Sequence, residues 1–492
     1  MTETILVIDA GTTSTRAMLF GAEGAKGPCA QEELTQHYPR PGWVEHDAEE
    51  IWAKSVACAQ EMVAEAGGPA AIAGIGITNQ RETIIFWSRR TGAALGPAIV
   101  WQDRRTADRC AALKEAGHEP EVQAKTGLLL DPYFSATKIG WALEHMPAVR
   151  EAGADLCVGT VESWLVFRLT AGLHISDATN ASRTALMDIG TGAWDSGLID
   201  LFGVPRGALP EIVDCAGRYG ETSADLFGAP IAITGMAGDQ QAAAIGQACL
   251  HPGDTKSTYG TGAFVLTNTG SERRASAHRL LSTIAWQIKG VRAFALEGSV
   301  FVAGSLIQWL RDGLGLVAAT SESEGLARSV PGNGGVYLVP ALSGLGAPYW
   351  APEARAAISG LSFAAGRAHI VRAALEAMAH QTHDLMTAFE GDGAAWASLK
   401  IDGGMAANDW IAQDLADMLG VPVERPRFIE TTASGAAMLA GVGAGLFGSL
   451  AEAAALRGPV EHFTPAMTDE AREVRLKGWR AAIDAVLRSA SH

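Results

Sequence analysis

The feature that most constrains the fold is a short apolar run that ends in an acidic, glycine-containing turn. It occurs three times, as Ile8-Asp9-Ala10-Gly11, Gly235-Met236-Ala237-Gly238-Asp239 and Ile401-Asp402-Gly403-Gly404. Between these turns, short β-rich runs alternate with Ala-rich helical stretches, a pattern typical of α/β architecture. Open α/β sheets bind their ligands at the carboxyl ends of the strands, so each turn is a candidate ligand contact.

A second pattern predicts a duplicated fold. The segment Tyr259-Gly260-Thr261-Gly262-Ala263-Phe264 resembles the first strand and its turn, with the break near residue 247. A chain of 492 residues is also too long for one hydrophobic core. We therefore expect two α/β domains, residues 1–247 and 248–492, whose turns surround one cleft.

Apolar and turn-forming residues predict the main elements. The expected strands are Thr4–Ile8, Ile72–Thr78, Thr83–Trp87, Ile231–Thr234, Phe264–Asn268, Ala293–Leu296, Gly335–Val339 and Ser398–Asp402. The expected helices are Ala48–Ala66, Ser135–His145, Gln240–Gln247, Val302–Gly313, His369–Glu390, Asn408–Leu419 and Ser434–Gly441.

Composition excludes several classes of protein. A net charge of −16 argues against a nucleic-acid-binding surface. The six cysteines form no C-x-x-C pair, which disfavours a zinc or redox motif and fits reduced thiols. No apolar run approaches the roughly 18 residues that span a bilayer, and no secretion signal is apparent. We expect a cytoplasmic protein that inserts into no membrane.

The turn between Asp9 and Arg16 suits a polyphosphate. Hydroxyl groups and successive backbone N–H groups can cradle anionic oxygens, and Arg16 adds a permanent charge. Asp9 is placed to hold a hydrated Mg²⁺ ion. The hydroxyl-bearing residues are Thr12, Thr13 and Ser14. A first core strand followed by an ordinary Thr/Ser loop remains the alternative at this point.

Three further segments carry groups that could recognise a small polyol. Arg81 and Glu82 offer fixed donors and acceptors. Trp101 can pack on a C–H surface and Tyr133 can contribute a hydroxyl, while Ser135 is a candidate N-cap for the helix that follows. The competing interpretations are a solvated loop with an incidental ion pair, a core tryptophan and a surface tyrosine.

The strongest catalytic candidate is Asp239. It stands between Gly238 and a helix start, where it can accept a proton from an attacking hydroxyl, although it could equally cap that helix. Gly260-Thr261 resembles a second phosphate-contacting turn, and Gly403–Asn408 suits an adenine base and ribose. No G-x-x-x-x-G-K-[ST] loop occurs, and the G-x-G-x-x-G match at Gly443–Gly448 follows a helix, which indicates a helix-terminating turn.

Taken together and in this order, these motifs resemble the FGGY carbohydrate kinase family from Ile5 to about residue 460. Tyr133–His145, Ala356–Glu376 and Gly344–Trp350 resemble runs typical of the whole family. Narrower runs resemble the members that phosphorylate glycerol. These are Pro41–Asp47, Ile77–Thr83, Thr179–Thr184 and Ala237–Ala243.

The resemblance implies two domains of the actin-like, ribonuclease H-like fold that close over ATP and substrate, and phosphorylation of glycerol to sn-glycerol 3-phosphate. Carried over by position, the glycerol contacts would be Arg81, Glu82, Trp101, Tyr133, Asp239, Gln240 and Phe264, with Asp239 as the base. The nucleotide contacts would be Thr12, Thr13, Ser14, Arg16, Thr261, Gly304, Gln308, Gly404 and Asn408. Asp9 would organise Mg²⁺ through water, and the protein would form a homodimer or homotetramer.

The chain also departs from its apparent relatives. Ala10 stands where a polar residue is usual, and Thr222–Ala229 lacks both the loop that binds fructose 1,6-bisphosphate in some homologues and the histidine that is phosphorylated in others. We therefore expect neither form of regulation. Two alternatives stay open: an FGGY kinase for a larger polyol or ketose, and a nucleotide-gated actin-like chaperone or filament protein.

Overall fold

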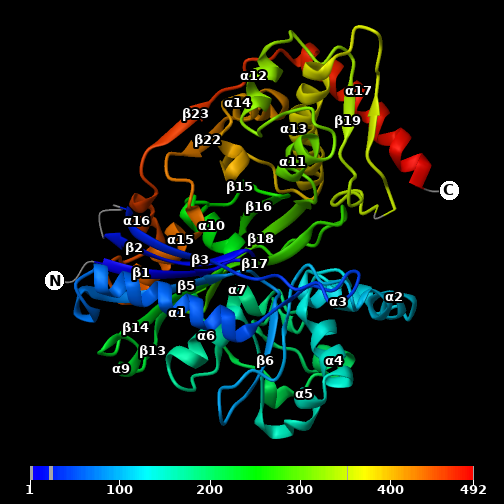
Figure 1. Ribbon diagram of the computed structural model, residues 1–492. Helices are drawn as coiled ribbons and strands as arrows, with labels where there is room; N and C mark the ends of the chain where they lie inside the picture. Colours follow the sequence, from blue (N-terminus) through cyan, green and yellow to red (C-terminus); the bar gives the residue numbers. More distant parts are fainter. Residues whose placement is uncertain (1–3, 22–25, 352, 491–492) are drawn as a thin grey trace.

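The computed structural model describes residues 4–21, 26–351 and 353–490. Two large mixed sheets dominate it, one built mainly from the first half of the chain and one from the second (Figure 1). The first has the order β13-β14-β5-β1-β2-β3 and the second the order β17-β18-β16-β15-β21-β22-β23. Their strands are β1 (Thr4–Ala10), β2 (Ser14–Gly21), β3 (Lys26–Glu33), β5 (Ile72–Asn79), β13 (Ala216–Glu221), β14 (Ala232–Gly238), β15 (Asp254–Tyr259), β16 (Ala263–Gly270), β17 (Leu281–Ile288), β18 (Val291–Val300), β21 (Ser398–Asp402), β22 (Val423–Pro426) and β23 (Val460–Phe463).

The two sheets share one topology, which confirms the predicted duplication. In the first, β1 pairs antiparallel with β2 and parallel with β5, and β5 pairs parallel with β14. In the second, β15 pairs antiparallel with β16 and parallel with β21, and β21 pairs parallel with β22. The strand–turn–strand unit at Tyr259–Phe264 thus occupies the place that the Asp9–Arg16 turn holds in the first sheet.

Helices cover both faces of these sheets, and further helices lie beside them. The helices of the described residues are α1 (Ala48–Glu65), α2 (Ala107–Glu115), α3 (Glu119–Thr126), α4 (Ser135–His145), α5 (Pro147–Glu151), α6 (Val161–Leu169), α7 (Ala178–Ala181), α8 (Ser196–Phe202), α9 (Ala224–Phe227), α10 (Asp239–Gly246), α11 (Gly304–Asp312), α12 (Glu322–Arg328), α13 (Arg367–Gly391), α14 (Asp409–Leu419), α15 (Thr431–Ala444), α16 (Leu450–Ala453) and α17 (Asp469–Ala490).

The apolar run that opens the chain is continuous because β1 is buried on both faces. Leu6 and Ile8 pack in the cluster that contains α1 and α6, whereas Ile5 and Val7 pack against the alanines of α15. This alternation follows the two-residue period of a strand. Each side chain of β1 therefore meets a helix on its own side of the sheet.

Helix α15 belongs to the second half of the chain but lies on the first sheet, where it also crosses α10 (Figure 1). Small residues allow the two helix backbones to approach closely. A Cβ atom at Gly435 would come within 1.8 Å of the Ala242 carbonyl oxygen, and one at Gly246 within 2.0 Å of the Thr431 carbonyl oxygen. Because Ala244 of α10 also packs against Leu266 in the second sheet, α10 is shared by both domains.

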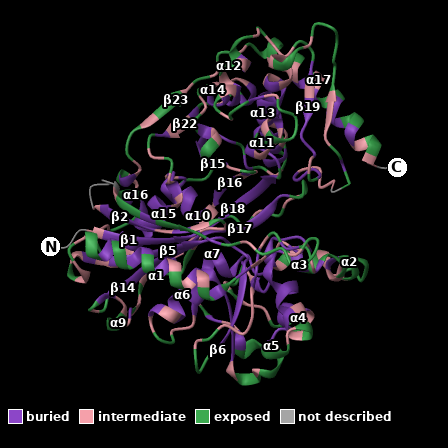
Figure 2. Ribbon diagram, viewed as in Figure 1, coloured by how far each residue is buried: buried purple, intermediate pink, exposed green. Residues whose placement is uncertain are grey.

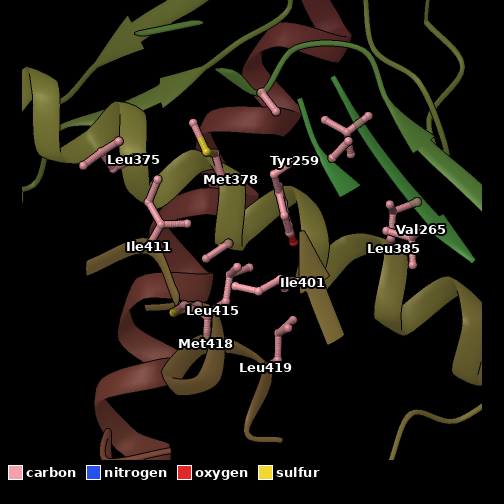
Figure 3. Close-up of a cluster of buried hydrophobic side chains, with 14 of the residues drawn as sticks. Tyr259, Val265, Leu375, Met378, Leu385, Ile401, Ile411, Leu415, Met418 and Leu419 are labelled. Atoms are coloured by element: carbon pink, nitrogen blue, oxygen red, sulfur yellow. The ribbon is translucent and has the colours of Figure 1, made fainter. Parts of the chain in front are cut away.

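The core of the second domain lies between its sheet and helices α13 and α14. Figure 3 shows Tyr259, Val265 and Ile401 from the strands facing side chains of those helices, and Figure 2 shows the same region as a buried layer. Tyr259 keeps its hydroxyl satisfied at 2.8 Å from the Thr382 hydroxyl. Burial of this apolar layer holds the second sheet and its helices as one unit.

A smaller sheet beside the first large one carries part of the candidate site. Its order is β4-β7-β6-β8, and α2 to α5 and α8 surround it. Its strands are β4 (Glu45–His46), β6 (Ile84–Ser88), β7 (Ala98–Ile99) and β8 (Leu156–Thr160). Three two-stranded pairs complete the fold: β9 (Ile175–Asp177) with β12 (Glu211–Val213), β10 (Met187–Asp188) with β11 (Ala193–Trp194), and β19 (Tyr337–Val339) with β20 (Ala357–Ser359).

Every strand and helix expected from the sequence is present, with shifts at the ends. Ser135–His145 and Ser398–Asp402 have the predicted bounds. The strand expected from Gly335 begins instead at Tyr337, because Gly334 and Gly335 form a left-handed turn in which the Gly335 N–H donates to the Asn333 side chain. α15 ends at Ala444 with Gly445 in a left-handed conformation, so the G-x-G-x-x-G match is a helix end, as predicted.

Among the described residues, no helix is both long enough and apolar enough to cross a membrane.

Candidate active site

Three parallel strands bring the polar turns of the first domain to one edge of its sheet. Asp9 in β1 is in register with Thr78 in β5, and Asn79 of β5 is in register with Gly238 of β14. The residues that follow these positions therefore emerge side by side, as expected for the carboxyl edge of an α/β sheet. The Gln80 N–H donates to the Ala10 carbonyl at 2.9 Å and ties two of the turns together.

Asp9 and Arg16 face each other across the β1–β2 hairpin. Arg16 donates to Asp9 Oδ2 from Nε at 2.8 Å and from Nη2 at 2.7 Å, and its Nη1 reaches Glu430 Oε2 at 2.5 Å. Burial raises the pKa of Asp9 above its usual value, although Arg16 opposes that shift. The turn between them, which includes Thr12, Thr13 and Ser14, closes with a Gly11 N–H to Ser14 carbonyl bond of 3.0 Å.

An aromatic wall connects this turn to the polyol candidates. Trp101 Nε1 donates to the Thr12 hydroxyl at 3.0 Å. The Trp101 ring lies edge-to-face with Tyr133 at 5.6 Å and with Phe264 of the second domain at 6.2 Å. The three predicted aromatic contacts are thus brought together from three distant segments of the chain.

The predicted polar groups also converge. Arg81 Nη2 donates to the Tyr133 hydroxyl at 3.2 Å, and Arg81 Nε lies 3.3 Å from Asp239 Oδ1 and 3.8 Å from Glu82 Oε1. Arg81 and Glu82 are almost fully buried, whereas the Asp239 side chain is 31% exposed. The Asp239 side chain is therefore more open to solvent than those of Arg81 and Glu82.

Glu82 holds an unusual backbone conformation, with φ of 62°. Non-glycine residues adopt this region at a cost, and they do so where surrounding contacts enforce it. The Ser135 hydroxyl donates to the Glu82 carbonyl at 3.0 Å, and Arg183 Nε donates to Glu82 Oε1 at 2.6 Å. The predicted capping role of Ser135 is wrong: the N-cap is Phe134, and the Ser135 hydroxyl holds Glu82 instead.

Asp239 is the first residue of α10, and its Oδ1 accepts from the Gln240 N–H at 2.7 Å. Burial raises the pKa of Asp239 to about 6, and Arg81 limits the rise. A carboxylate with a pKa near neutrality is suited to accept a proton in a reaction. The alternative role as a plain helix cap does not explain its contact with Arg81.

Gln240 is oriented from the second domain. Lys256 Nζ donates to Gln240 Oε1 and, at 2.8 Å, to the Thr258 hydroxyl. Lys256 is fully buried, and that burial lowers its pKa. Because the amide oxygen of Gln240 is occupied, its NH₂ group is left to donate to a ligand.

The nucleotide candidates of the second domain form a separate group. The Gly304 N–H donates to the Gly260 carbonyl at 2.9 Å, and the Ala303 N–H donates to the Thr261 carbonyl at 2.9 Å. A Cβ atom at Gly304 would lie 3.0 Å from Met405 Cγ, next to Gly404. Gln308 is an exposed residue of α11, and Asn408 Oδ1 caps α14 by accepting from the Ile411 N–H.

Within the described ranges, no hydrogen bond joins the Thr12–Arg16 turn to the Thr261–Gly304 group. The two groups come from equivalent turns of the duplicated fold. The carboxylate of the third acidic turn is held within the protein, because Asp402 Oδ2 accepts from Gln247 Nε2 at 3.1 Å and from the Thr431 hydroxyl at 2.6 Å.

The sequence did not reveal three charged residues of the site: Arg183, Lys256 and Glu297. All three are at most 1% exposed. A charged residue within a short β-rich run is the signal that could have found the last two, since Lys256 lies in β15 and Glu297 in β18. Arg183 lies in the run Thr179–Thr184, which contributed to the family resemblance but was given no role in the site.

The duplicated sheet topology, with acidic and hydroxyl-rich turns at the strand ends, defines an actin-like ATPase fold of the kinase type. The FGGY family of carbohydrate kinases matches over residues 4–246 with its N-terminal domain and over residues 255–444 with its C-terminal domain. The chain belongs to the FGGY family of carbohydrate kinases.

Several individual members of this family are similar to the chain over almost its whole length. A glycerol kinase from Methylobacterium nodulans is 53% identical, covering 99% of both chains. The crystal structure of Plasmodium falciparum glycerol kinase with ADP superposes with a TM-score of 0.93 at 36% identity, covering 98% of both chains. A xylulose kinase structure from Rhodospirillum rubrum gives a TM-score of 0.87 at 26% identity, covering 99% of both chains.

Proposed function

We propose that the protein transfers the γ-phosphoryl group of ATP to a terminal hydroxyl of glycerol, giving sn-glycerol 3-phosphate and ADP. The observation that carries this proposal is the convergence of Arg81, Glu82 and Asp239 beside the aromatic wall of Trp101 and Phe264. A small polyol offers hydroxyls to the first group and C–H surface to the second. The glycerol kinases among the relatives support the choice of glycerol.

In this proposal Asp239 accepts the proton of the attacking hydroxyl. The hydroxyl oxygen then forms a bond to the γ-phosphorus while the bond from that phosphorus to the bridging oxygen of ADP breaks, and ADP leaves with that electron pair. Arg81 and Glu82 hold the other hydroxyls by paired donors and acceptors, so an acceptor with a different pattern leaves buried groups unsatisfied. Tyr133 and Gln240 complete the proposed set of glycerol contacts.

The phosphates would lie between the two equivalent turns. Thr12, Thr13, Ser14 and Arg16 would contact them from the first domain and Thr261 from the second, and closure of the domains would exclude water. The adenosine would lie along the second domain. Its proposed contacts are Gly304, Gln308, Gly404 and Asn408.

The residues present fit a hydrated Mg²⁺ ion at Asp9. Both Arg16 donors bind Asp9 Oδ2, which leaves Oδ1 without a hydrogen bond to any described residue. Mg²⁺ on ATP keeps several waters and needs only one or two carboxylates from a protein. When bound, the ion would neutralise charge on the phosphates, while Asp9 holds its water shell in place.

A coupled assay of ADP production with glycerol, dihydroxyacetone, erythritol and xylulose tests the proposal. We expect the highest kcat/KM with glycerol. A preference for xylulose would assign the protein to the ketose kinases of the family. ATP hydrolysis at an equal rate with no acceptor would favour the nucleotide-gated chaperone or filament class.

Three further points are part of the proposal. The division at residues 247 and 248 is supported by the family matches on either side of it. A cytoplasmic location and a homodimeric or homotetrameric state are expected from the family resemblance. Cell fractionation tests the location, and light scattering of the purified protein measures the oligomeric state.

A further inference from the structure

Glu297 connects the second domain to the proposed polyol site of the first. It lies in β18, in the second sheet, and its side chain is 1% exposed. Its Oε2 accepts from Arg81 Nη1 at 2.5 Å, and its Oε1 accepts from Arg183 Nη2 at 2.8 Å. One carboxylate of the second domain thus bridges two arginines of the first.

The charges in this cluster balance only when Glu297 is ionised. Arg81, Arg183, Glu82 and Glu297 are all at most 1% exposed at their side chains, so two buried cations face two buried anions. Although burial alone would raise the pKa of Glu297, Arg183 and Arg81 lower it to about 2. Glu297 therefore stays a carboxylate across the working pH range, and its removal would strand a buried cation.

The same bonds set the direction in which Arg81 faces. The guanidinium group is planar and rigid, so fixing one nitrogen fixes the others. While Nη1 is held by Glu297 and by Gln241 Oε1 at 3.2 Å, Nη2 points to the Tyr133 hydroxyl and Nε to Asp239. Through Arg183, Glu297 also braces Glu82, whose carboxylate accepts from Arg183 Nε.

We propose that Glu297 is a positioning residue for acceptor recognition, which orients Arg81 directly and Glu82 through Arg183. It makes the acceptor site complete only when the second domain is docked against the first. This inference rests on the proposed function, in that Arg81 and Glu82 are taken to bind the acceptor.

The test compares Glu297→Gln with a matched control, Glu376→Gln. Glu376 is also buried, and it accepts from Arg372 Nε at 2.9 Å within the second domain, away from the polyol candidates. We expect Glu297→Gln to raise the KM for glycerol at least tenfold and to change the KM for ATP less than twofold. The control is expected to change both values less than twofold. Equal changes in the two KM values, or the same pattern in the control, would overturn the proposal.

A second variant distinguishes a loss of positioning from a loss of stability. The double variant Arg183→Gln/Glu297→Gln removes one buried cation together with one anion, so the remaining Arg81 is still paired with Glu82. We expect it to unfold at a higher temperature than Glu297→Gln while keeping a raised KM for glycerol. A KM at the wild-type value would mean that Glu297 only balances charge, and the positioning role would be rejected.

Wild-type protein in the same assay separates this inference from the proposed function. If the wild type prefers another acceptor over glycerol, the proposed function fails. The Glu297 comparison is then made with that acceptor, since its readout is the change in acceptor KM against the change in ATP KM.

Discussion

The indole Nε1 of Trp101 donates to the hydroxyl of Thr12 at 3.0 Å. This bond joins the wall of the polyol site to the turn proposed to hold the phosphates. The two residues are 89 positions apart in the sequence. If the two residues bind the acceptor and the phosphates as proposed, their contact would couple the positions of the two substrates.

Trp101→Phe keeps an aromatic ring and removes the donor, so it tests that coupling. We expect the KM for ATP and the KM for glycerol both to rise by roughly three- to tenfold, since a hydrogen bond contributes about 1 kcal/mol. Initial rates over a grid of both substrates measure the change. Trp141→Phe is the control on α4, and an equal effect there would show that the coupling does not depend on Thr12.

Asp239→Asn keeps the size of the side chain but removes its basicity. We expect kcat to fall by about 10²- to 10⁴-fold, the usual contribution of a general base. Glycerol binding, measured by calorimetry, should be retained in part because Arg81, Glu82 and Tyr133 remain. Turnover near the wild-type rate would remove Asp239 from the role of base.

The pKa of Asp239 predicts the acid side of the pH profile. Burial raises it to about 6, and only the ionised form accepts a proton, so we expect activity to be half-maximal near pH 6 and to be lost as the pH falls below that value. We expect kcat/KM for glycerol to fall tenfold per pH unit below that value. Asp384→Asn is the control, because burial also raises the pKa of Asp384 to about 6, but its partners are Tyr349 and Trp479. If the acid side of the kcat/KM profile also shifts in Asp384→Asn, the titrating group is not Asp239.

Arg16 is shared between Asp9 and Glu430, and both carboxylates oppose the approach of phosphate. We expect Arg16→Gln to raise the KM for ATP at least tenfold. Glu430→Gln should lower it two- to threefold, because a neutral side chain holds Arg16 Nη1 less strongly and leaves it freer to donate to the nucleotide. Substrate titrations measure both values, and a higher ATP KM in Glu430→Gln would show that Glu430 positions Arg16.

A buried acid away from the reacting groups predicts the pH dependence of stability. Burial, together with the charge of Asp177, raises the pKa of Glu162 from 4.5 to about 8, and no described residue forms a hydrogen bond with its Oε2. Between these two values the folded state keeps a proton that the unfolded state has lost. The free energy of unfolding should therefore fall as the pH rises from 4.5 to 8, by at most about 1.4 kcal/mol per unit.

Glu162→Gln replaces the protonated acid with a neutral side chain of the same shape, so the slope should flatten in this pH range. Urea unfolding at several pH values measures it. Glu61→Gln, at an exposed position of α1, serves as the control. A slope unchanged in Glu162→Gln would place the titration at another group.

Local sequence was sufficient to predict the repeated sheet unit. Ile5–Ile8 and its turn, and the matching turn at Thr261, depend on neighbouring residues whose preferences agree with the fold. The error at Ser135 arose because a distant carbonyl, that of Glu82, takes the hydroxyl that a helix end would otherwise use. Local capping rules contain no information about such a competitor.

The polar half of the site could be predicted from motifs, but the groups that hold it could not. Arg81 and Glu297 are 216 positions apart, and although a charge within an apolar strand marks Glu297, nothing in its local sequence identifies Arg81 as its partner. Its role depends on which edge of the second sheet faces the first domain. That is a property of tertiary packing.

The return of α15 to the first sheet has a consequence for synthesis of the chain. Ile5 and Val7 of β1 pack against Ala433, Ala436 and Ala440, so one face of the first sheet stays uncovered until those residues have left the ribosome. At roughly 5–20 residues per second, the nearly 200 residues between α10 and the end of α15 take about 10 to 40 seconds to make. During that interval the nascent chain exposes an apolar sheet face, and exposed apolar surface of this kind favours aggregation until α15 covers it.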